Sequence, residues 1–549
     1  MKEAKMTIKS KFIFITGGVC SSLGKGIAAA SIGMLLKSSG LKVFVMKMDP
    51  YLNVDPGTMN PAQHGEVFVS DDGAETDLDL GHYERIMDQP VTKISSVSSG
   101  QIYNEISEKE RKGDFLGETI QIIPHITDKI KEKILTAAET SGADIVIIEI
   151  GGTVGDIEGE PFLEAIRQLR DELPFNFTLS VHLSFLIYLE SSNELKTKPT
   201  QHSVALLKKY GIRPDIILAR ADRKISEHAL AKISKFCGVP EKAIIPAPTV
   251  ENIYEIPLNF QKRNIVELIG KKLEFNDLKP NLKQWSNLIE TVKIVQNNPE
   301  SEIKIAIVGK YFNKGADVYI SVVEAIKHAS WQFEKNPRID FINSEDIETS
   351  GFNLWNFKKY GGVVVPGGFG ARGTEGIINA IGFCRKNKVP FLGLCFGMQL
   401  AVVEFARNVA DLVETHTTEI NPKTKYPVID LMVNQKQINK KGGTMRLGKY
   451  PCVLKEGTIS RKCYGMKTER IEERHRHRYE FNNKYRNILE KFGLVIAGVS
   501  PDNKLVEIVE LNEEDHPFFV GVQFHPEFLS RPLNPHPLFR GFIKTVIKK

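Results

Sequence analysis

Continuous apolar runs alternate with helix-like stretches in two separate parts of the chain. The first series is FIFIT (12–16), KVFVMKMD (42–49), DIVIIEI (144–150), FTLSVHLSFLIYL (177–189) and DIILARAD (215–222). The second series is KIAIVGKY (304–311), GGVVVPGG (361–368) and VPFLGLC (389–395). Strands that are apolar on both faces are typical of parallel sheets covered by helices on both sides. The pattern therefore predicts an α/β protein with two doubly wound domains.

A polar stretch separates the two series. It contains one helical pattern, followed by a Pro and Asn cluster before residue 302. This composition predicts an interdomain connector. We expect a first domain at 1–275, a linker at 276–301 and a second domain at 302–549. A chain of 549 residues is too long for one hydrophobic core, which agrees with this division.

Composition excludes several function classes. The formal charge of +6 arises from 73 basic against 67 acidic residues and is spread along the chain, so nucleic acid is not an expected partner. No apolar run is long enough to span a bilayer, and the N-terminal apolar stretch is too short for a signal peptide. The six cysteines lack paired metal-ligand spacing, which favours reduced thiols. We expect a cytoplasmic protein without a membrane partner.

The stretch GVCSSLGKGIAAAS (18–31) has the parts of a phosphate loop: glycines after a strand, a lysine and the start of a helix. The sequence of this loop differs from the usual phosphate-loop motif at two positions. Five residues separate Gly18 from Gly24, and Gly26 follows Lys25 where a Ser or Thr normally helps to hold Mg²⁺. The alternative is a glycine-rich helix cap that binds nothing.

Two carboxylates are candidates for the missing metal ligand. Asp79 lies in the acidic stretch SDDGAETDLDLGHYER (70–85), and Glu149 lies near the end of a buried strand. An ionised carboxylate at such a strand end needs a strong partner, and Mg²⁺ prefers oxygen ligands. Solvated acidic side chains are the alternative.

FLGLCFGMQLA (391–401) places Cys395 between a predicted strand and a predicted helix, with Gly393 and Gly397 two residues to either side. This spacing is typical of a nucleophile elbow, in which glycines permit a tight turn and the helix N-terminus favours the thiolate. A buried structural cysteine is the usual alternative, which the flanking glycines make less attractive.

Candidate partners for this cysteine follow further along the second domain. GVQFHPEF (521–528) offers His525 as a base and Glu527 as the carboxylate that orients its imidazole. PGGFG (366–370) offers backbone amides near Gly367 and Gly368 for an oxyanion hole. Together these three features predict a nucleophilic cysteine site.

At this point the sequence resembles a known family. GLCFGMQ (393–399), FHPE (524–527) and PGGFG are similar to class I glutamine amidotransferases. GGVCSSLGKG (17–26), the stretch DPYLNVDPG to GHYER (49–85), EIGGTVGDIE (149–158) and KTKPTQHSV (196–204) resemble the CTP synthase family. The resemblance covers nearly the whole chain. It implies an N-terminal P-loop-like amidoligase (synthase) domain related to dethiobiotin synthetase, and a C-terminal class I glutamine amidotransferase domain.

The resemblance also implies an activity. In the family, ATP phosphorylates O4 of UTP, and ammonia released from L-glutamine in the other domain displaces that phosphate to give CTP. Mg²⁺ is the implied cofactor and ATP a co-substrate. GTP is the implied activator and CTP the implied feedback inhibitor, and the family forms homotetramers and filaments.

Site residues follow from the resemblance position by position. The catalytic residues are Cys395, His525 and Glu527, and the metal ligands are Asp79 and Glu149. The ATP positions are Ser22, Leu23, Gly24, Lys25, Gly26, Ile27, Lys47, Asp79, Pro248, Thr249 and Val250. The UTP and CTP positions are Ser21, Asp156, Ile157, Glu158, Lys196, Thr197, Lys198, Pro199, Thr200, Gln201 and Lys232. The glutamine positions are Gly368, Phe396, Gly397, Met398, Gln399, Glu419 and Arg478.

Several positions carry weaker signals. The alternating basic residues of ERHRHRYE (473–480), which include Arg478, also fit an exposed strand face. His64 and Val67 match positions beside the family's ammonia passage. The Lys-rich loop at 435–441 departs from the family pattern, and its role does not follow from the sequence.

Three rival interpretations remain open at this stage. A ParA- or MinD-like ATPase shares the unusual loop and the parallel sheet but does not explain the Cys395 domain. A cobyrate-synthase-like amidotransferase has both domains but lacks KTKPTQ. A filament-forming protein in which catalysis is secondary is the third.

Overall fold

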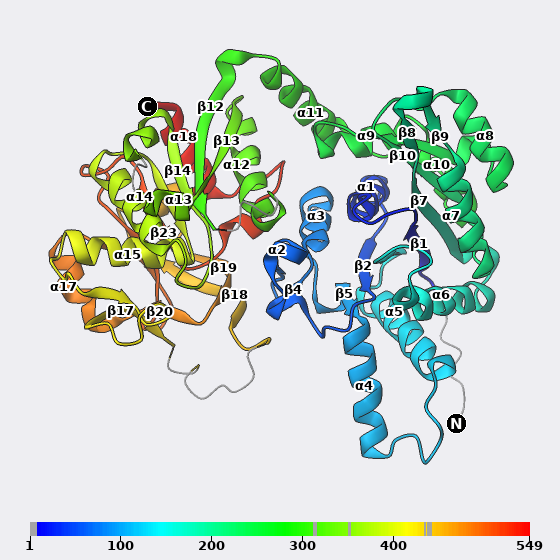
Figure 1. Cartoon of the computed structure of the whole chain (residues 1–549), viewed down its shortest axis with the longest axis horizontal. Coiled ribbons are helices and arrows are strands. Elements are labelled where there is room, and N and C mark those ends of the chain that lie inside the picture. The colour runs from blue at the N-terminus through cyan, green and yellow to red at the C-terminus, as the bar shows by residue number, and fades with distance from the viewer. Residues whose placement is uncertain (1–7, 311–315, 350–352, 433–434, 436–441, 549) are drawn as a thin grey trace. The chain divides into compact units, whose positions relative to one another are not determined.

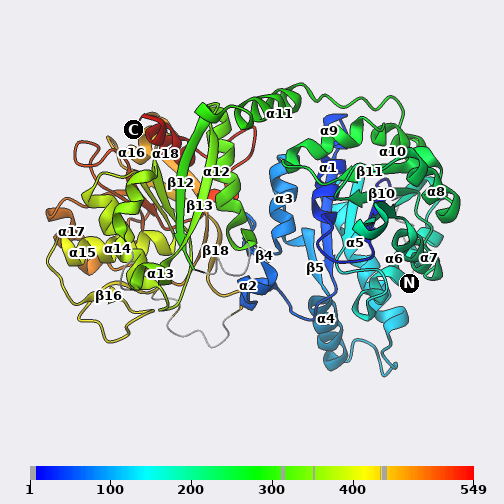
Figure 2. The ribbon, with the colours of Figure 1, turned by 45° about the horizontal axis from the view of Figure 1, so that its top comes forward.

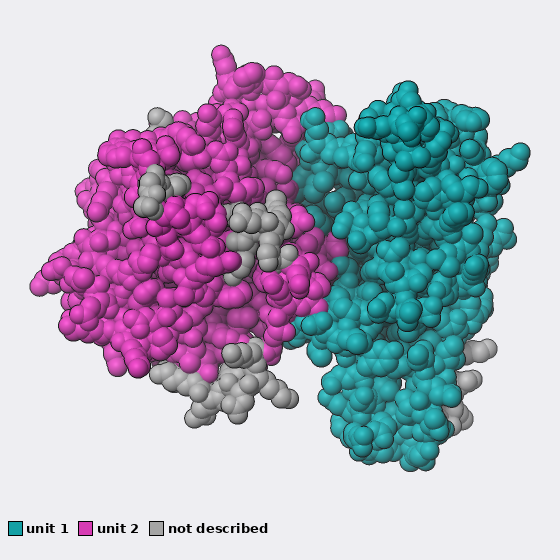
Figure 3. Space-filling model, viewed as in Figure 1, with its two compact units in different colours: residues 1–55, 82–286 teal, residues 56–81, 287–549 magenta. Residues whose placement is uncertain are grey.

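The computed structural model describes residues 8–310, 316–349, 353–432, 435 and 442–548. The chain forms two compact units, shown as ribbons in Figures 1 and 2 and by colour in Figure 3. Unit 1 contains residues 1–55 and 82–286, and unit 2 contains residues 56–81 and 287–549. Residues 56–81, which precede most of unit 1 in the sequence, thus belong to unit 2.

Unit 1 is built on a seven-stranded sheet in the order β11-β10-β7-β1-β6-β2-β5. All neighbouring strands are parallel, as the apolar runs predict. The strands are β1 Lys11–Gly17, β2 Val43–Asp49, β5 Ser96–Ser98, β6 Ile145–Ile150, β7 Thr178–Phe185, β10 Ile216–Ala221 and β11 Ile244–Pro248. The run 177–189 is not one strand, because it divides into β7 and β8 (Ile187–Leu189), which pairs antiparallel with β9 (Glu194–Lys196).

Helices cover both faces of this sheet. Phe12 and Phe14 of β1 join a core with the apolar sides of α4, α5 and α6, whereas Ile13 and Ile15 alternate toward the other face, where α1 packs. The helices are α1 Lys25–Ser38, α4 Ser99–Lys112, α5 Thr127–Ser141, α6 Glu160–Glu172, α7 Lys198–Lys209, α8 Glu227–Cys237, α9 Ile256–Gln261 and α10 Ile265–Leu273.

Unit 2 contains a nine-stranded mixed sheet in the order β13-β12-β14-β15-β23-β22-β21-β18-β19. The predicted strands β12, β14 and β15 are parallel, together with β13 and β23. An antiparallel extension that the apolar runs do not predict follows β23. The strands are β12 Glu302–Gly309, β13 Asn336–Asn343, β14 Gly362–Val365, β15 Phe391–Leu394, β18 Arg446–Leu454, β19 Arg470–His477, β21 Val495–Val499, β22 Val506–Glu510 and β23 Phe519–Val522.

Two separate cores lie on the two faces of this sheet. One core contains the apolar sides of α14 and α15, and the other contains those of α12 and α18. The helices are α12 Ile320–Gln332, α13 Ser344–Glu348, α14 Thr374–Lys386, α15 Phe396–Asn408, α16 Ile459–Tyr464, α17 Arg486–Lys491 and α18 Pro537–Lys548. A smaller sheet contains β16 Thr415–Thr417, β17 Tyr426–Leu431 and β20 Tyr479–Phe481. The fold class predicted from the sequence is confirmed.

The remaining elements lie outside these sheets. The 56–81 segment contains α2 Pro61–His64 and the paired strands β3 Phe68–Val69 and β4 Glu75–Thr76, and α3 (Leu78–Met87) follows. The helix predicted in the connector is α11 Lys283–Gln296. All six cysteines are free thiols. Within the described ranges, no helix has the length and apolar character needed to cross a bilayer.

Candidate active sites

The phosphate-loop sequence forms the turn between β1 and α1. Gly24 precedes the helix with φ +86°, and Ser22 also has a left-handed φ of +58°. The Lys25 ammonium donates to the carbonyl of Gly152, 2.7 Å away, and a Cβ on Gly17 would lie 2.8 Å from Cδ of Lys25. The lysine is thus held across the carboxyl end of the sheet, where doubly wound proteins bind ligands.

A cavity of about 250 Å³ lies beside this loop. It joins the loop positions Ser22–Gly24 and Ile27 to Pro248–Val250, which lie more than two hundred residues away in the sequence. The structure therefore brings these ATP positions together, whereas the other expected ATP positions, Lys25, Gly26, Lys47 and Asp79, are not among the lining residues. The remaining lining residues are largely apolar, which suits the faces of a purine ring.

Arg220 and Phe260 also line this cavity, and sequence reasoning missed both. Arg220 donates to the carbonyl of Ala247 at 3.1 Å, and burial lowers the pKa of Arg220 despite the opposing charge of Asp222. The sequence feature that could have indicated this role is the arginine inside the otherwise apolar run DIILARAD. A half-buried guanidinium plane is suited to stacking on a heteroaromatic ring.

The two expected metal ligands lie on different elements. Glu149 is the residue before the last in β6 and lies in register with Lys47 of β2. Tyr83 of α3 donates to its carboxylate. Asp79 lies in the first turn of α3. Among the described residues, no three His, Cys, Asp or Glu side chains gather as a preformed metal cluster. Each carboxylate offers oxygen ligands of the kind that Mg²⁺ prefers.

The expected UTP and CTP positions fall on four segments of unit 1. Lys196 ends β9, and Thr197 precedes α7 and accepts a hydrogen bond from Gln201 at 3.0 Å. Asp156 caps a separate turn, where its carboxylate accepts from the amide of Thr153 at 2.8 Å. A third segment, the exposed side of α8, contributes Lys232, and a fourth, the loop between β1 and α1, contributes Ser21.

Cys395 occupies a strained turn between β15 and α15. Its φ is +51°, a region that non-glycine residues rarely adopt except at functional turns. A Cβ on Gly393 would lie 2.8 Å from the carbonyl carbon of Gly397, and one on Gly397 would lie 2.2 Å from the oxygen of Val365. The flanking glycines are therefore required by close backbone contacts, and the turn has the geometry of a nucleophile elbow.

His525 and Glu527 are paired beside this cysteine. Nδ1 of His525 lies 2.7 Å from Oε1 of Glu527. Burial by itself would lower the pKa of His525, but the negative charge of Glu527 and the interaction with Cys395 raise it to about 10. The amide of Gln523, which sequence reasoning missed, donates to the Cys395 sulfur at 3.6 Å. The arrangement can hold a thiolate and an imidazolium together.

The cavity around the thiol is lined by the expected residues Gly368, Cys395, His525 and Glu527. The 56–81 segment contributes Val67 to its wall, whereas His64 is exposed and is not among the lining residues. Further contributors that were not predicted include Pro61, Glu66, Tyr319 and Arg476. The remaining glutamine positions, Phe396–Gln399, form the first turn of α15.

Glu419 and Arg478 are not among the residues that line this cavity. Glu419 accepts from the amide of Gly370 at 2.9 Å, and burial raises its pKa. Arg478 donates to Oε1 of Gln435 at 2.7 Å. Gln435 is the first residue of the Lys-rich loop, and the remaining residues of that loop, 436–441, lie outside the described ranges.

A buried lysine near the glutamine positions was also missed. Lys310, at the end of β12, donates to the carbonyl of Phe369 at 3.2 Å, and its ammonium lies 4.6 Å from the ring centre of Phe396. Burial lowers the pKa of Lys310 to about 8, which the charge of Glu419 partly offsets. The run KIAIVGKY does not indicate that Lys310 is buried near the glutamine positions, because a lysine at a strand end is usually solvated.

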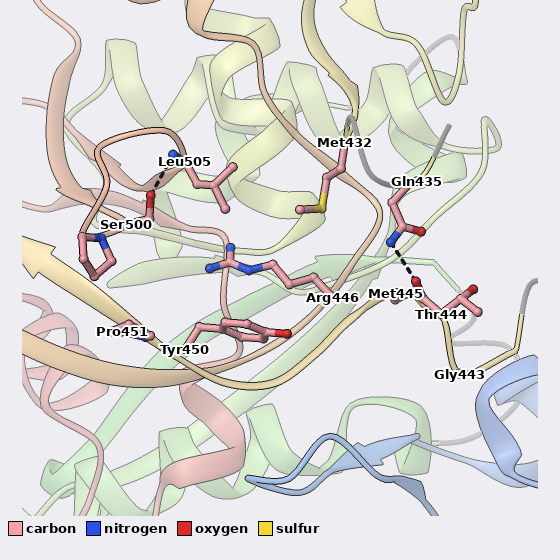
Figure 4. A pocket seen from close by; sticks show the side chains of 11 residues that line it. Met432, Gln435, Gly443, Thr444, Met445, Arg446, Tyr450, Pro451, Ser500 and Leu505 are labelled. Carbon is pink, nitrogen blue, oxygen red and sulfur yellow. Dashed lines mark hydrogen bonds between the residues drawn. The ribbon is translucent and has the colours of Figure 1, made fainter. Parts of the chain in front are cut away.

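A separate and larger cavity of about 630 Å³ lies in unit 2 (Figure 4). Arg446 reaches into it, with its guanidinium paired to Glu507 at 2.8 Å and 4.5 Å from the ring centre of Tyr450. Gln435 donates to the carbonyl of Thr444 on its rim at 2.7 Å. None of the residues assigned from the sequence is among those that line it.

A phosphate loop on a parallel sheet, joined to a strained Cys–His–Glu site on a second sheet, defines an ATP-dependent amidoligase fused to a glutamine amidotransferase. The family model described as CTP synthase N-terminus matches residues 11–275, and the model described as glutamine amidotransferase class-I matches residues 315–545. The chain belongs to the CTP synthase family. It is a glutamine-hydrolysing ligase of pyrimidine biosynthesis that converts UTP to CTP.

Curated relatives agree over nearly the full length. A CTP synthase of Dehalococcoides mccartyi is 53% identical over 98% of this chain and 97% of its own length. One of Carboxydothermus hydrogenoformans is 54% identical over 98% of this chain and 99% of its own length. A solved glutaminase domain of Trypanosoma brucei CTPS with bound acivicin is 35% identical, with a TM-score of 0.42, and covers 45% of this chain and 94% of that one.

Proposed function

We propose that the two sites described above divide the CTP synthase reaction, with glutamine hydrolysed at Cys395 and UTP aminated at the sheet that carries Lys25. The observation that carries this assignment is the strained φ of Cys395 beside the His525–Glu527 pair. A thiol held in such a turn is poised for attack on a carbonyl carbon.

In the glutaminase half, the Cys395 thiolate attacks the side-chain amide carbon of glutamine. The amides near Gly367 and Gly368 stabilise the oxyanion that develops on the carbonyl oxygen. His525 then gives its proton to the departing nitrogen, the C–N bond breaks, and ammonia leaves a thioester. Water, deprotonated by His525, hydrolyses that thioester to glutamate and restores the thiolate, while Glu527 fixes the orientation of the imidazole.

In the synthase half, O4 of UTP attacks the γ-phosphorus of ATP and ADP departs. Ammonia then attacks C4 of the pyrimidine, and the C4–O bond breaks to release inorganic phosphate. Lys25 and Lys47 neutralise the charge of the transferring phosphoryl group. Asp79 and Glu149 would hold Mg²⁺, which supplies further charge neutralisation at the phosphates when bound.

Substrate positions are assigned in the same proposal. ATP occupies the cavity between Ser22–Ile27 and Pro248–Val250, with Arg220 beside the base. UTP binds at Lys196–Gln201 with Ser21 and Lys232, and product CTP also uses Asp156–Glu158. Glu419 receives the α-amine of glutamine and Arg478 its α-carboxylate.

Our proposals on regulation, assembly and location rest on membership of the family alone. We propose activation by GTP, feedback inhibition by CTP, a homotetramer that extends into filaments, and a cytoplasmic location.

A turnover assay tests the central assignment. Purified protein is supplied with UTP, ATP, Mg²⁺ and glutamine, and CTP, ADP, phosphate and glutamate are quantified. Equal yields of the four products are expected. An ATPase or glutaminase activity without CTP formation would reject the proposal.

A further inference from the structure

Arg474 of β19 holds the 56–81 segment from inside unit 2. It is 1% exposed, with Nε 2.6 Å from Oδ1 of Asp71 and Nη1 donating to the carbonyl of Val69 at 3.1 Å. Burial by itself would raise the pKa of Asp71, but the positive charges of Arg474 and Lys449 lower it. The Asp71 carboxylate is therefore ionised at neutral pH, and the contact is a charge-assisted anchor.

Arg476 makes a second anchor two residues along the same strand. Its Nε lies 2.8 Å from Oε1 of Glu75, and its Nη2 donates to the carbonyl of Gly57 at 3.1 Å. Glu75 is only 6% exposed, and a Cβ on Gly57 would lie 2.2 Å from its Oε2. The carboxylate is thus enclosed between the strand and the segment. Arg474 and Arg476 of ERHRHRYE do not form an exposed strand face, because their side chains are directed to this segment. The third arginine, Arg478, donates to Gln435 instead.

The main chains of the same two arginines contact the catalytic residues. The amide of His525 donates to the carbonyl of Arg474 at 2.8 Å, and the Cys395 sulfur lies 3.8 Å from the carbonyl oxygen of Arg476. One strand therefore holds the segment with its side chains and the Cys395–His525 pair with its backbone.

The segment in turn forms part of the wall of the thiol cavity. Glu66 and Val67 line that cavity, and Glu66 accepts from the amide of Ser321 at 3.1 Å. Phe68 packs edge-on against Phe528, another lining residue, with ring centres 5.1 Å apart. The segment is therefore fastened at Asp71 and Glu75 and presents its preceding residues to the thiol.

We propose that Arg474 and Arg476, through Asp71 and Glu75, are positioning residues for glutamine hydrolysis. The two arginines hold the 56–81 segment in place. The segment then forms the part of the cavity wall that positions glutamine over Cys395. This inference deepens the proposed function and rests on it. A buried arginine that loses its carboxylate partner is strongly disfavoured, so release of the anchors shifts the wall. Small displacements of a wall that orients a substrate carry large costs in rate.

The test uses the full chain with Asp71→Asn, Glu75→Gln and the double variant, which preserve size and remove charge. Asp72→Asn is the matched control, because Asp72 lies in the same loop, is exposed, and accepts a hydrogen bond from the hydroxyl of Ser70 at 2.5 Å. Glutamate release, CTP synthesis from glutamine, CTP synthesis from ammonium salt and thermal unfolding are measured for each protein. Labelling of Cys395 is followed with acivicin, taken as a glutamine-like electrophile, and with iodoacetamide.

We expect the double variant to raise the KM for glutamine and to slow acivicin labelling, each by about ten-fold. Synthesis from ammonium and labelling by iodoacetamide should stay within about two-fold of the wild type, because the substitutions replace neither the thiol nor any residue assigned to the synthase site. Each single variant should show a smaller effect of the same kind, and the control none. If the double variant does not fold, the KM and acivicin labelling rates of the single variants test the inference.

Two results would overturn the inference: an unchanged KM and acivicin rate in the folded variants, or an equal loss of glutamine- and ammonia-dependent synthesis. Both presuppose a wild type that makes CTP from glutamine. A wild type that makes none would instead reject the proposed function, so the two failures are distinguishable.

Discussion

Nδ1 of His525 lies 2.7 Å from Oε1 of Glu527, and this carboxylate helps to raise the pKa of the imidazole to about 10. The proton that the departing ammonia requires is therefore present at neutral pH and is lost as the pH rises through about 10. Glu527→Gln removes the negative charge and should lower the pKa of His525. We expect the alkaline limb of glutaminase activity to move down by about one pH unit or more.

The measurement is the pH profile of kcat/KM for glutamate release. Ammonia-dependent CTP synthesis serves as the internal control, because its profile should not change. An alkaline limb at the wild-type position would show that Glu527 does not set the protonation of His525.

Cys395→Ala tests the division of labour between the sites. Synthesis of CTP from glutamine should be lost completely, whereas synthesis from ammonium salt should persist at a pH that supplies free NH₃. Loss of one sulfur atom from a cavity wall should cost little stability, so unfolding is not expected to explain the result. His525→Ala should resemble this variant but retain slight activity, because the helix N-terminus still favours the thiolate. Retained glutamine use in Cys395→Ala would contradict the scheme.

Lys25→Ala should abolish CTP formation with either nitrogen source. The ammonium that lies 2.7 Å from the carbonyl of Gly152 is directed across the phosphate loop, where it neutralises the transferring phosphoryl group in both reactions. Glutamate release, which occurs on the other sheet, provides the control for folding. Substantial ammonia-dependent synthesis by this variant would remove the lysine from its assigned role.

Asp79→Ala and Glu149→Ala should each raise the Mg²⁺ concentration needed for synthesis or abolish synthesis. Reactivity of the Cys395 thiol toward iodoacetamide should remain, because that site lies on a separate sheet. Titration of CTP synthesis with MgCl₂ measures the effect, and direct Mn²⁺ binding followed by electron paramagnetic resonance provides a readout without turnover. A wild-type metal dependence in both variants would exclude the two carboxylates.

Gly397→Ala tests the close packing of the nucleophile turn. The new Cβ would lie 2.2 Å from the carbonyl oxygen of Val365, so the strand and helix must separate. We expect the free energy of unfolding to fall by about 1–3 kcal/mol, with loss of glutaminase activity. Gly159→Ala is the control for unfolding, because its Cβ meets no atom within 4 Å. Equal stability of the two variants would show that the turn tolerates a side chain.

Much of the local chemistry followed from the sequence. The apolar runs predicted the parallel strands of both sheets, because strands buried on both faces must be apolar throughout. The glycines flanking Cys395 and the glycine before Lys25 predicted their turns. A Cβ at Gly393 or Gly397 would collide with nearby backbone, and Gly24 has a positive φ that glycine adopts readily. The prediction of a single strand over 177–189 is wrong, because apolar composition does not reveal where a chain leaves a sheet.

The positions of distant segments were decided by the tertiary structure alone. No local spacing indicates that Asp71 pairs with Arg474, because these partners lie hundreds of residues apart. The resemblance placed Val67 beside the family's ammonia passage, but only the folded chain shows that it lines the cavity of Cys395. The same holds for Arg220 beside the phosphate loop. Local spacing determines turns and strands through short-range sterics, whereas buried charge pairs and cavity walls form only when remote elements pack together.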